Sequence, residues 1–192
     1  MYLATFTSAP TQSHYLHACR LLKYIADSPN YGILFRDQPD GVRVVCRVYS
    51  DAAEGTHASG HGHCGIMVTL GSGYISARSS KITMVTLSAS EAERFGTAVG
   101  GTYAVFMTAI IPRFGHTIEG PVHMHMDSTS AEAALSREGP FAWNKHKKGF
   151  VGVIDTTHTP GTILVADMLT KPLAIGPLER HIKKAGLVSL SS

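Results

Sequence analysis

The chain has 192 residues, of which 44% are hydrophobic and 16% are charged. This balance supplies enough apolar surface for one substantial core and excludes a disordered chain, so we expect one main globular domain. The formal net charge of +3 is too small to indicate a nucleic-acid partner by itself.

The cysteines argue against a disulfide-bonded or zinc-bound scaffold. Cys19, Cys46 and Cys64 are odd in number, widely spaced and without a C-x-x-C pair. We therefore expect an intracellular, reducing location, without a choice between a cytoplasmic particle and the nucleus. The start of the chain lacks a basic segment followed by an apolar run, and no later stretch is expected to be long and apolar enough to cross a bilayer. No membrane partner is therefore expected.

The first part of the chain predicts one helix and three strands. Residues 13–27 carry apolar side chains at helical spacing and predict an amphipathic helix that ends before a turn-prone Ser-Pro-Asn. Residues 42–51 alternate between two faces, which predicts a half-buried strand with Asp51 at its C-terminal end. The apolar runs 65–70 and 74–77 flank a Gly-Ser-Gly sequence typical of a tight hairpin. The three strands are expected to form an antiparallel meander.

The rest of the chain predicts helices and strands in alternation. Ser88 and Glu91 form a capping-box pattern at the start of a long helix that is expected to run towards Ile111. The alternating residues 121–127 then predict a strand that ends in Asp127. A short helix, another strand and two helical pieces are expected over residues 128–135, near residues 150–154, and around Ala166 and Leu178.

This order of elements predicts an α/β domain with a mixed sheet. Ligands of such sheets bind beyond the carboxyl ends of the central strands, and Asp51 and Asp127 both occupy that position. Phosphodiester cleavage by two metals needs several carboxylates that converge on ions roughly 3.5–4 Å apart. Glu93 lies at a helix start and Asp167 on a later helix, so these two acids could join Asp51 and Asp127 in such a cluster. Its oxygen ligands suit Mg²⁺.

Four phrases resemble, in order, the ribonuclease H region that ends the polyproteins of copia-type LTR retrotransposons: YSDAAEG, HCGIMVTLGSGYISARSSKITMVTLSASEAE, VHMHMDSTSAEAAL and VADMLTKPL. A strand-end S-D-A is a weak signal alone, but L-S-x-x-E-A-E followed by A-D-M-L-T-K-P-L is specific. Upstream, PTQSHYLHACRLLKYIADSPNYGILFR resembles the segment that closes the reverse transcriptase of these polyproteins. We therefore expect a reverse-transcriptase tail over residues 1–40 and a ribonuclease H-like domain over residues 41–192.

The resemblance implies a ribonuclease H-like mixed five-stranded sheet, made of a three-stranded antiparallel meander plus parallel strands and flanked by helices. It also implies an endonuclease that hydrolyses the RNA strand of RNA/DNA hybrids by a two-metal mechanism, next to the upstream reverse transcriptase. By the same resemblance, Mg²⁺, or Mn²⁺ as a substitute, binds the carboxylates of Asp51, Glu93, Asp127 and Asp167. The alternative is a catalytically inactive, decayed remnant that acts as a nucleic-acid-binding or structural module.

Two site assignments leave alternatives open. Glu91 competes with Glu93, and we favour Glu93 because it matches the family's A-E dipeptide while Glu91 has a capping role. His158 lies in a T-T-H-T-P segment where the family often carries a histidine suggested to aid proton transfer or product release, and a surface role is equally compatible with the sequence.

Other features are weaker candidates. His57, His61, His63 and Cys64 could bind zinc in principle, but solvent-exposed histidines are the simpler reading. The basic run 145–148, with Trp143 nearby, could contact hybrid phosphates or form a solvated loop. The chain also departs from the family, which usually has a tryptophan at Ala77 and amide side chains where this chain has Ser128 and Thr129.

Overall fold

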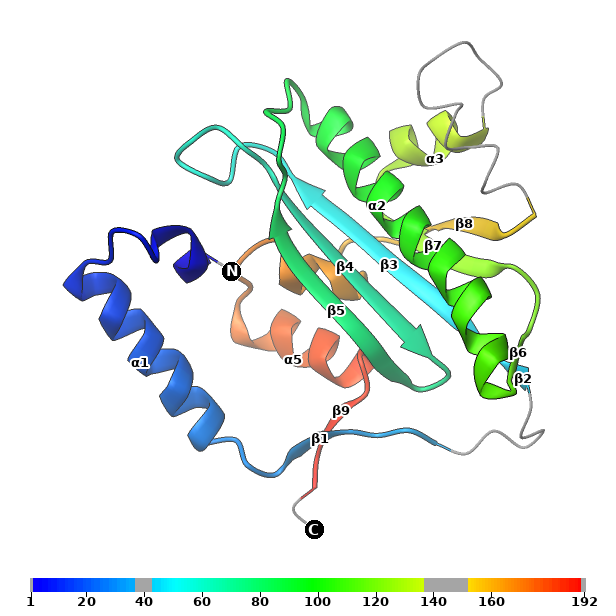
Figure 1. The fold of residues 1–192 in the computed structure, drawn as a ribbon, viewed down its shortest axis with the longest axis horizontal. Helices are drawn as coiled ribbons and strands as arrows, with labels where there is room; N and C mark the ends of the chain where they lie inside the picture. Colours follow the sequence, from blue (N-terminus) through cyan, green and yellow to red (C-terminus); the bar gives the residue numbers. More distant parts are fainter. Residues whose placement is uncertain (1, 37–42, 137–151, 191–192) are drawn as a thin grey trace.

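A mixed five-stranded sheet forms the centre of the protein, as Figure 1 shows. The computed structural model describes residues 2–36, 43–136 and 152–190. The strands lie in the order β5-β4-β3-β7-β8. β3 pairs antiparallel with β4 and β4 with β5, whereas β3, β7 and β8 run parallel. This confirms the predicted meander and mixed sheet. The strands are β3 (Cys46–Ala53), β4 (His63–Leu70), β5 (Gly73–Lys81), β7 (Val122–Met126) and β8 (Ile154–His158).

Helices cover both faces of the sheet. The long helix α2 (Ala89–Ile110) packs on one face, and the 3-10 helix η3 (Val165–Leu169) lies with α5 (Ile175–Lys184) on the other. Each face has its own buried core, which includes Val48 and Met124 on the α2 side and Tyr49 and Met67 on the other side. Because β3 is covered on both faces, almost its whole length is buried. The prediction that this strand would be only half-buried was therefore wrong.

The backbone of α2 lies close to the sheet because it carries glycines at the contact. A Cβ added to Gly100 would lie 2.5 Å from the Met124 methyl and 3.3 Å from Ser50 Cβ, and one on Gly96 would lie 3.1 Å from Ala52 Cβ. Ser88 caps the helix, as predicted, by accepting a hydrogen bond from the Glu91 N–H. The segment Ala89–Phe114 is long and apolar enough, by length and composition alone, to cross a membrane, so the expectation that no such stretch exists was wrong. Core helices pass the same test, and α2 does pack on the sheet.

Several boundaries differ from those predicted. The strand expected near residues 150–154 is β8, which begins only at Ile154, after a turn in which Gly152 has a φ of +76°. The strand expected over residues 42–51 is divided into β2 (Arg43–Val44) and β3. β2 pairs with β6 (Thr117–Ile118), outside the central sheet. The helix expected over residues 128–135 is α3 (Thr129–Ser136), and η2 (Ile111–Phe114) extends α2.

The N-terminal segment joins the domain through a strand of its own. It contains η1 (Tyr2–Phe6), α1 (Gln12–Ala26) and β1 (Tyr31–Ile33), and β1 pairs antiparallel with β9 (Leu187–Ser189) rather than with the central sheet. Ser72 in the β4–β5 turn donates a hydrogen bond to the Leu34 carbonyl and accepts one from the Arg36 N–H. No residue of α1 is buried, and the helix stands away from the sheet in Figure 1.

Deletion experiments should separate the roles of α1 and β1. Removal of residues 1–29 should change the melting temperature little, because no side chain of α1 is buried. Removal of residues 1–36 should also free β9 and the β4–β5 turn. Loss of several net hydrogen bonds should cost about 2 kcal/mol, a fall of about 4–8 °C for a chain of this size. Circular dichroism melts would measure both values, and unfolding of the shorter deletion would contradict the peripheral role of α1.

Candidate active site

Three carboxylates converge at one edge of the central sheet. Asp51 lies near the C-terminal end of β3, Asp127 follows β7 directly, and Glu93 lies in the second turn of α2. One carboxylate oxygen from each side chain lies within 4.8 Å of the other two. Because β3 and β7 are parallel neighbours, their carboxyl ends meet at the same edge, where ligands of such sheets bind. The structure therefore brings together three of the four predicted acids.

Local contacts hold these three side chains in place. The buried hydroxyl of Thr170 donates a hydrogen bond to Asp51 Oδ2. Glu93 is hydrogen-bonded to the main chain of Ala52, the residue that follows Asp51. A Cβ added to Gly161 would lie 3.1 Å from Asp127 Oδ2, so the loop after β8 lies directly against this carboxylate. Contacts from β3, from the end of η3 and from the loop after β8 thus each hold one of the three carboxylates.

Burial and mutual repulsion raise pKa values in this cluster. Burial, followed by the neighbouring carboxylates of Asp51 and Asp127, raises the pKa of Glu93 to about 8. The pKa of Asp51 is raised mainly by burial, and the Thr170 hydrogen bond opposes that shift. Without a cation, the cluster therefore retains a proton on Glu93 at neutral pH.

The fourth predicted acid lies beside this group and already has a partner. Asp167 is buried on η3, and its Oδ1 forms an ion pair with Lys171. It does not belong to the set whose ligand atoms all lie within 4.8 Å of one another. Thr170 and Lys171 were not predicted from the sequence to be parts of the site. The only available signal was their position three and four residues after Asp167, inside the phrase that carried the family resemblance.

His158 and Glu91 are both placed clearly by the structure. His158 is the last residue of β8, and its Nε2 donates a hydrogen bond of 3.1 Å to the main-chain carbonyl of Asp127. The ring is exposed and lies beside the acid cluster. The carboxylate of Glu91 accepts a 2.8 Å hydrogen bond from the Leu87 N–H. Glu91 therefore caps α2, while Glu93 belongs to the cluster.

The donor set of the cluster fits a hard divalent cation. All three donors are carboxylate oxygens, the ligand type that Mg²⁺ prefers. Opposite ligands of an octahedral Mg²⁺ ion lie about 4.2 Å apart, since each bond is about 2.1 Å, so a spacing within 4.8 Å needs little adjustment. In the part of the chain that the structure describes, this is the one group of three or more such ligands. His57, His61, His63 and Cys64, which could in principle bind zinc, do not form such a group there, and residues 143–148 lie outside the described residues.

Sequence relatives connect the chain with mobile elements. No family model matches it. Two retrovirus-related Pol polyproteins of Arabidopsis thaliana, from transposons RE1 and RE2, are 26% and 24% identical over alignments that cover 96% and 98% of this chain. The chain spans 13% of the length of each relative.

Solved structures with a similar arrangement include two ribonuclease H proteins. The N-terminal ribonuclease H domain of a Mycobacterium tuberculosis protein, fused to maltose-binding protein, is similar over 74% of this chain and 99% of that chain, with a TM-score of 0.47 and 18% identity. Ribonuclease H1 of the archaeon Halobacterium salinarum is similar over 66% of this chain and 93% of that chain, with a TM-score of 0.41 and 16% identity. The chain is thus similar in sequence to transposon Pol polyproteins, and its strand order is that of the mixed five-stranded sheet predicted from the sequence.

Proposed function

We propose that this chain hydrolyses the RNA strand of RNA/DNA hybrids in a magnesium-dependent reaction. The observation that carries the proposal is the convergence of Asp51, Glu93 and Asp127 from three separate elements to within 4.8 Å. Homology to transposon Pol polyproteins supports the same class of activity, because the copying of a retroelement produces such hybrids.

The proposed roles follow from the contacts of each side chain. Asp51, Glu93 and Asp127 would hold Mg²⁺, or Mn²⁺ in its place, and Asp167 would join them by exchanging its partner Lys171. Two such ions, when bound, activate a water and stabilise the leaving oxygen. Thr170 keeps one oxygen of Asp51 oriented. Glu93 releases its proton as the cation binds, since ligands bind metals in their deprotonated form.

His158 is proposed to handle a proton next to the cluster. Its Nε2 donates to the Asp127 carbonyl, so Nδ1 of the neutral ring remains an acceptor. An imidazole beside reacting groups can serve as a general acid or base.

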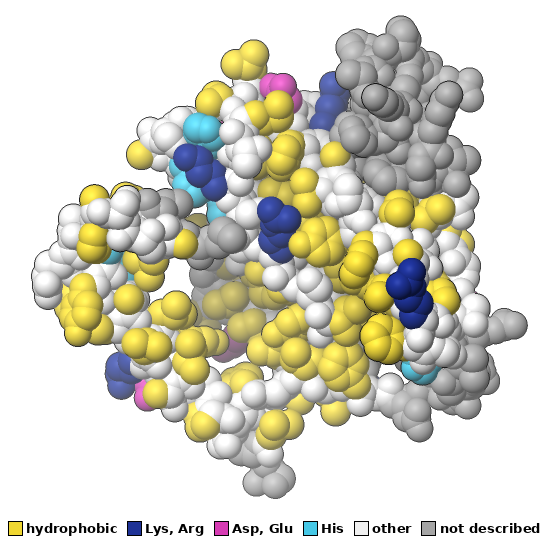
Figure 2. Space-filling model, in the orientation of Figure 1, with side chains coloured by type: hydrophobic (Ala, Val, Ile, Leu, Met, Phe, Trp, Pro, Cys, Tyr) yellow, Lys and Arg dark blue, Asp and Glu magenta, His cyan; other side chains and the backbone are white. Residues whose placement is uncertain are grey.

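The proposed partner on the N-terminal side is the reverse transcriptase portion of the polyprotein. Helix α1 has no buried residue and exposes several large apolar side chains, and Figure 2 shows hydrophobic side chains along this segment. The exposed side chains are those of Tyr15, Leu16, Leu21, Leu22, Tyr24 and Ile25. The relatives are much longer Pol polyproteins, in which an adjacent domain could cover these side chains. The boundary near residue 40 remains part of this proposal.

Hybrid cleavage is the direct test. Purified protein with Mg²⁺ should cut the RNA strand of a fluorescently labelled RNA/DNA hybrid, and EDTA should stop the reaction. Asp127→Asn should lower kcat at least a hundredfold, because it removes one charged ligand from the cluster.

Glu91→Gln is the matched control for this assay, since it changes a carboxylate on the same helix outside the cluster. It should keep kcat within a few fold of the wild type, whereas Glu93→Gln should resemble Asp127→Asn. Hybrid binding without acid-dependent cleavage would instead favour the inactive, nucleic-acid-binding remnant.

Without metal, the free energy of unfolding should fall as pH rises from about 4.5 to about 8. The pKa of Glu93 is about 8 in the folded protein against an ordinary value of 4.5. Between these values the folded state binds more protons than the unfolded state, so stability decreases as pH increases. Thermal melts in EDTA at several pH values would measure the trend. Glu93→Gln should flatten it and raise the melting temperature at pH 8, because the amide cannot ionise.

Mg²⁺ should offset this loss at pH 8. Binding to the folded state alone contributes about 2.7 kcal/mol at a hundredfold excess over Kd, while Na⁺ at matched ionic strength should give no comparable shift. Glu91→Gln should keep the wild-type behaviour in both conditions. A metal-free stability that rises with pH across this window would contradict the raised pKa of Glu93.

A further inference from the structure

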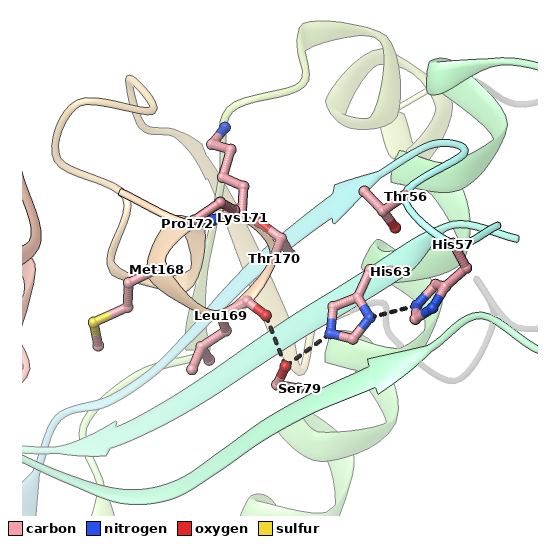
Figure 3. Close-up of a pocket in the computed structure, with 9 residues that line it drawn as sticks. All are labelled: Thr56, His57, His63, Ser79, Met168, Leu169, Thr170, Lys171 and Pro172. Carbon is pink, nitrogen blue, oxygen red and sulfur yellow. Dashed lines mark hydrogen bonds between the residues drawn. The ribbon is translucent and has the colours of Figure 1, made fainter. Parts of the chain in front are cut away.

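A pocket of about 460 Å³ lies next to the acid cluster on the η3 side of the sheet. Its walls come from the β3–β4 loop, from β4 and β5, and from η3 with the residues that follow it, as Figure 3 shows. Thr170, which contacts Asp51, and Lys171, which contacts Asp167, both line it. One wall carries a continuous chain of hydrogen bonds that ends on the last residue of η3.

The donor and acceptor roles along these hydrogen bonds follow from the number of protons that each group carries. The Ser79 hydroxyl has one hydrogen and gives it to the Leu169 carbonyl at 2.8 Å, so it must accept at its 2.7 Å contact with His63 Nε2. His63 therefore carries its proton on Nε2. In the neutral ring Nδ1 then accepts, and His57 Nε2 donates to it at 2.9 Å. Burial, and next the neighbouring His57, lower the pKa of His63, which favours this neutral form.

The chain of hydrogen bonds ends on η3, a short element with few internal hydrogen bonds. η3 is a five-residue 3-10 helix, a type with weaker internal hydrogen bonds than an α-helix. It lies tightly against β4, since a Cβ added to Gly65 would lie 2.7 Å from Leu169 Cβ and 2.9 Å from the Ala166 carbonyl oxygen. Ser79 binds the Leu169 carbonyl immediately before Thr170. A shift of this carbonyl would therefore move the Thr170 hydroxyl relative to Asp51.

We propose that Ser79 and His63 are positioning residues for the acid cluster, with His57 selecting the tautomer of His63. They hold the end of η3 so that Thr170 meets Asp51 and Asp167 stays beside the other carboxylates. The proposal rests on the proposed function, in which these acids bind Mg²⁺. Small displacements of such groups have large effects, because a misplacement of about 1 Å can reduce a rate roughly a hundredfold.

Ser79→Ala tests the link, and Ser80→Ala is its matched control. Ser80 is the next residue of β5, is buried on the opposite face and accepts a hydrogen bond from Arg78 instead. Ser79→Thr keeps the hydroxyl and should rescue the function. Each protein would be titrated with Mg²⁺ alone by calorimetry or by thermal shift, and kcat and KM would be measured on a hybrid.

Ser79→Ala should weaken Mg²⁺ binding about fivefold or more and lower kcat at least tenfold, with KM within about twofold of the wild type. Ser79→Thr and Ser80→Ala should match the wild type in both measurements. Equal Mg²⁺ affinity and kcat for Ser79→Ala and Ser80→Ala would overturn the proposal. If Ser79→Ala does not fold, His63→Phe keeps a ring but removes the donor to Ser79, and the same signs are expected.

Two measurements distinguish this proposal from the proposed function: Mg²⁺ binding and the tautomer of the His63 ring. A wild type that binds Mg²⁺ but does not cleave, with weaker binding in Ser79→Ala, would refute the function and support the positioning role. A wild type that binds no Mg²⁺ would refute both. Nitrogen NMR of the His63 ring without metal should show the proton on Nε2, and a proton on Nδ1 alone would contradict the chain.

Discussion

The parallel pairing of β3 with β7 is the constraint on which the rest of this site depends. The register joins Arg47 to His123 and Tyr49 to His125, so both strands end at the same edge and present Asp51 and Asp127 there. Two parallel strands need a long connection, which here contains the rest of the meander and α2. Small residues let α2 pack closely against β3. Its first turns therefore lie over the same edge and bring Glu93 to the two aspartates.

This convergence has an electrostatic cost that the surrounding structure only partly offsets. Three buried or half-buried carboxylates repel one another and have lost hydration, which raises the pKa of Glu93 and Asp51. Thr170 and the main chain of Ala52 donate hydrogen bonds to the cluster, and Lys171 contributes a positive charge. A divalent cation would complete this compensation. The cluster is thus unfavourable for a metal-free protein and well suited to a metal-dependent one.

The places where the chain departs from the family it resembles have local structural roles. Ser128 caps α3 by accepting a hydrogen bond from the Ala131 N–H, and its hydroxyl also contacts Ser130. Ser130 contacts Ser90 at the start of α2, so these hydroxyls connect the two helices beside the acid cluster. Ala77 lies exposed on the edge strand β5, where a large aromatic side chain is usual in the family. Asp127, which immediately precedes the altered residues Ser128 and Thr129, remains in the cluster.

The sequence by itself determined the meander, the capped start of α2 and the strand next to Asp127, because alternation, caps and glycine turns are local signals. It favoured Glu93 over Glu91 without deciding between them, and the structure places Glu93 in the cluster and Glu91 at the helix cap. Only the tertiary structure decided that Asp167 pairs with Lys171, that Thr170 binds Asp51 and that β8 starts at Ile154. Contacts such as Thr170 with Asp51 join residues more than a hundred positions apart, and strand pairing sets where β8 begins. Whether such residues meet depends on how the elements pack, which no local pattern of residues encodes.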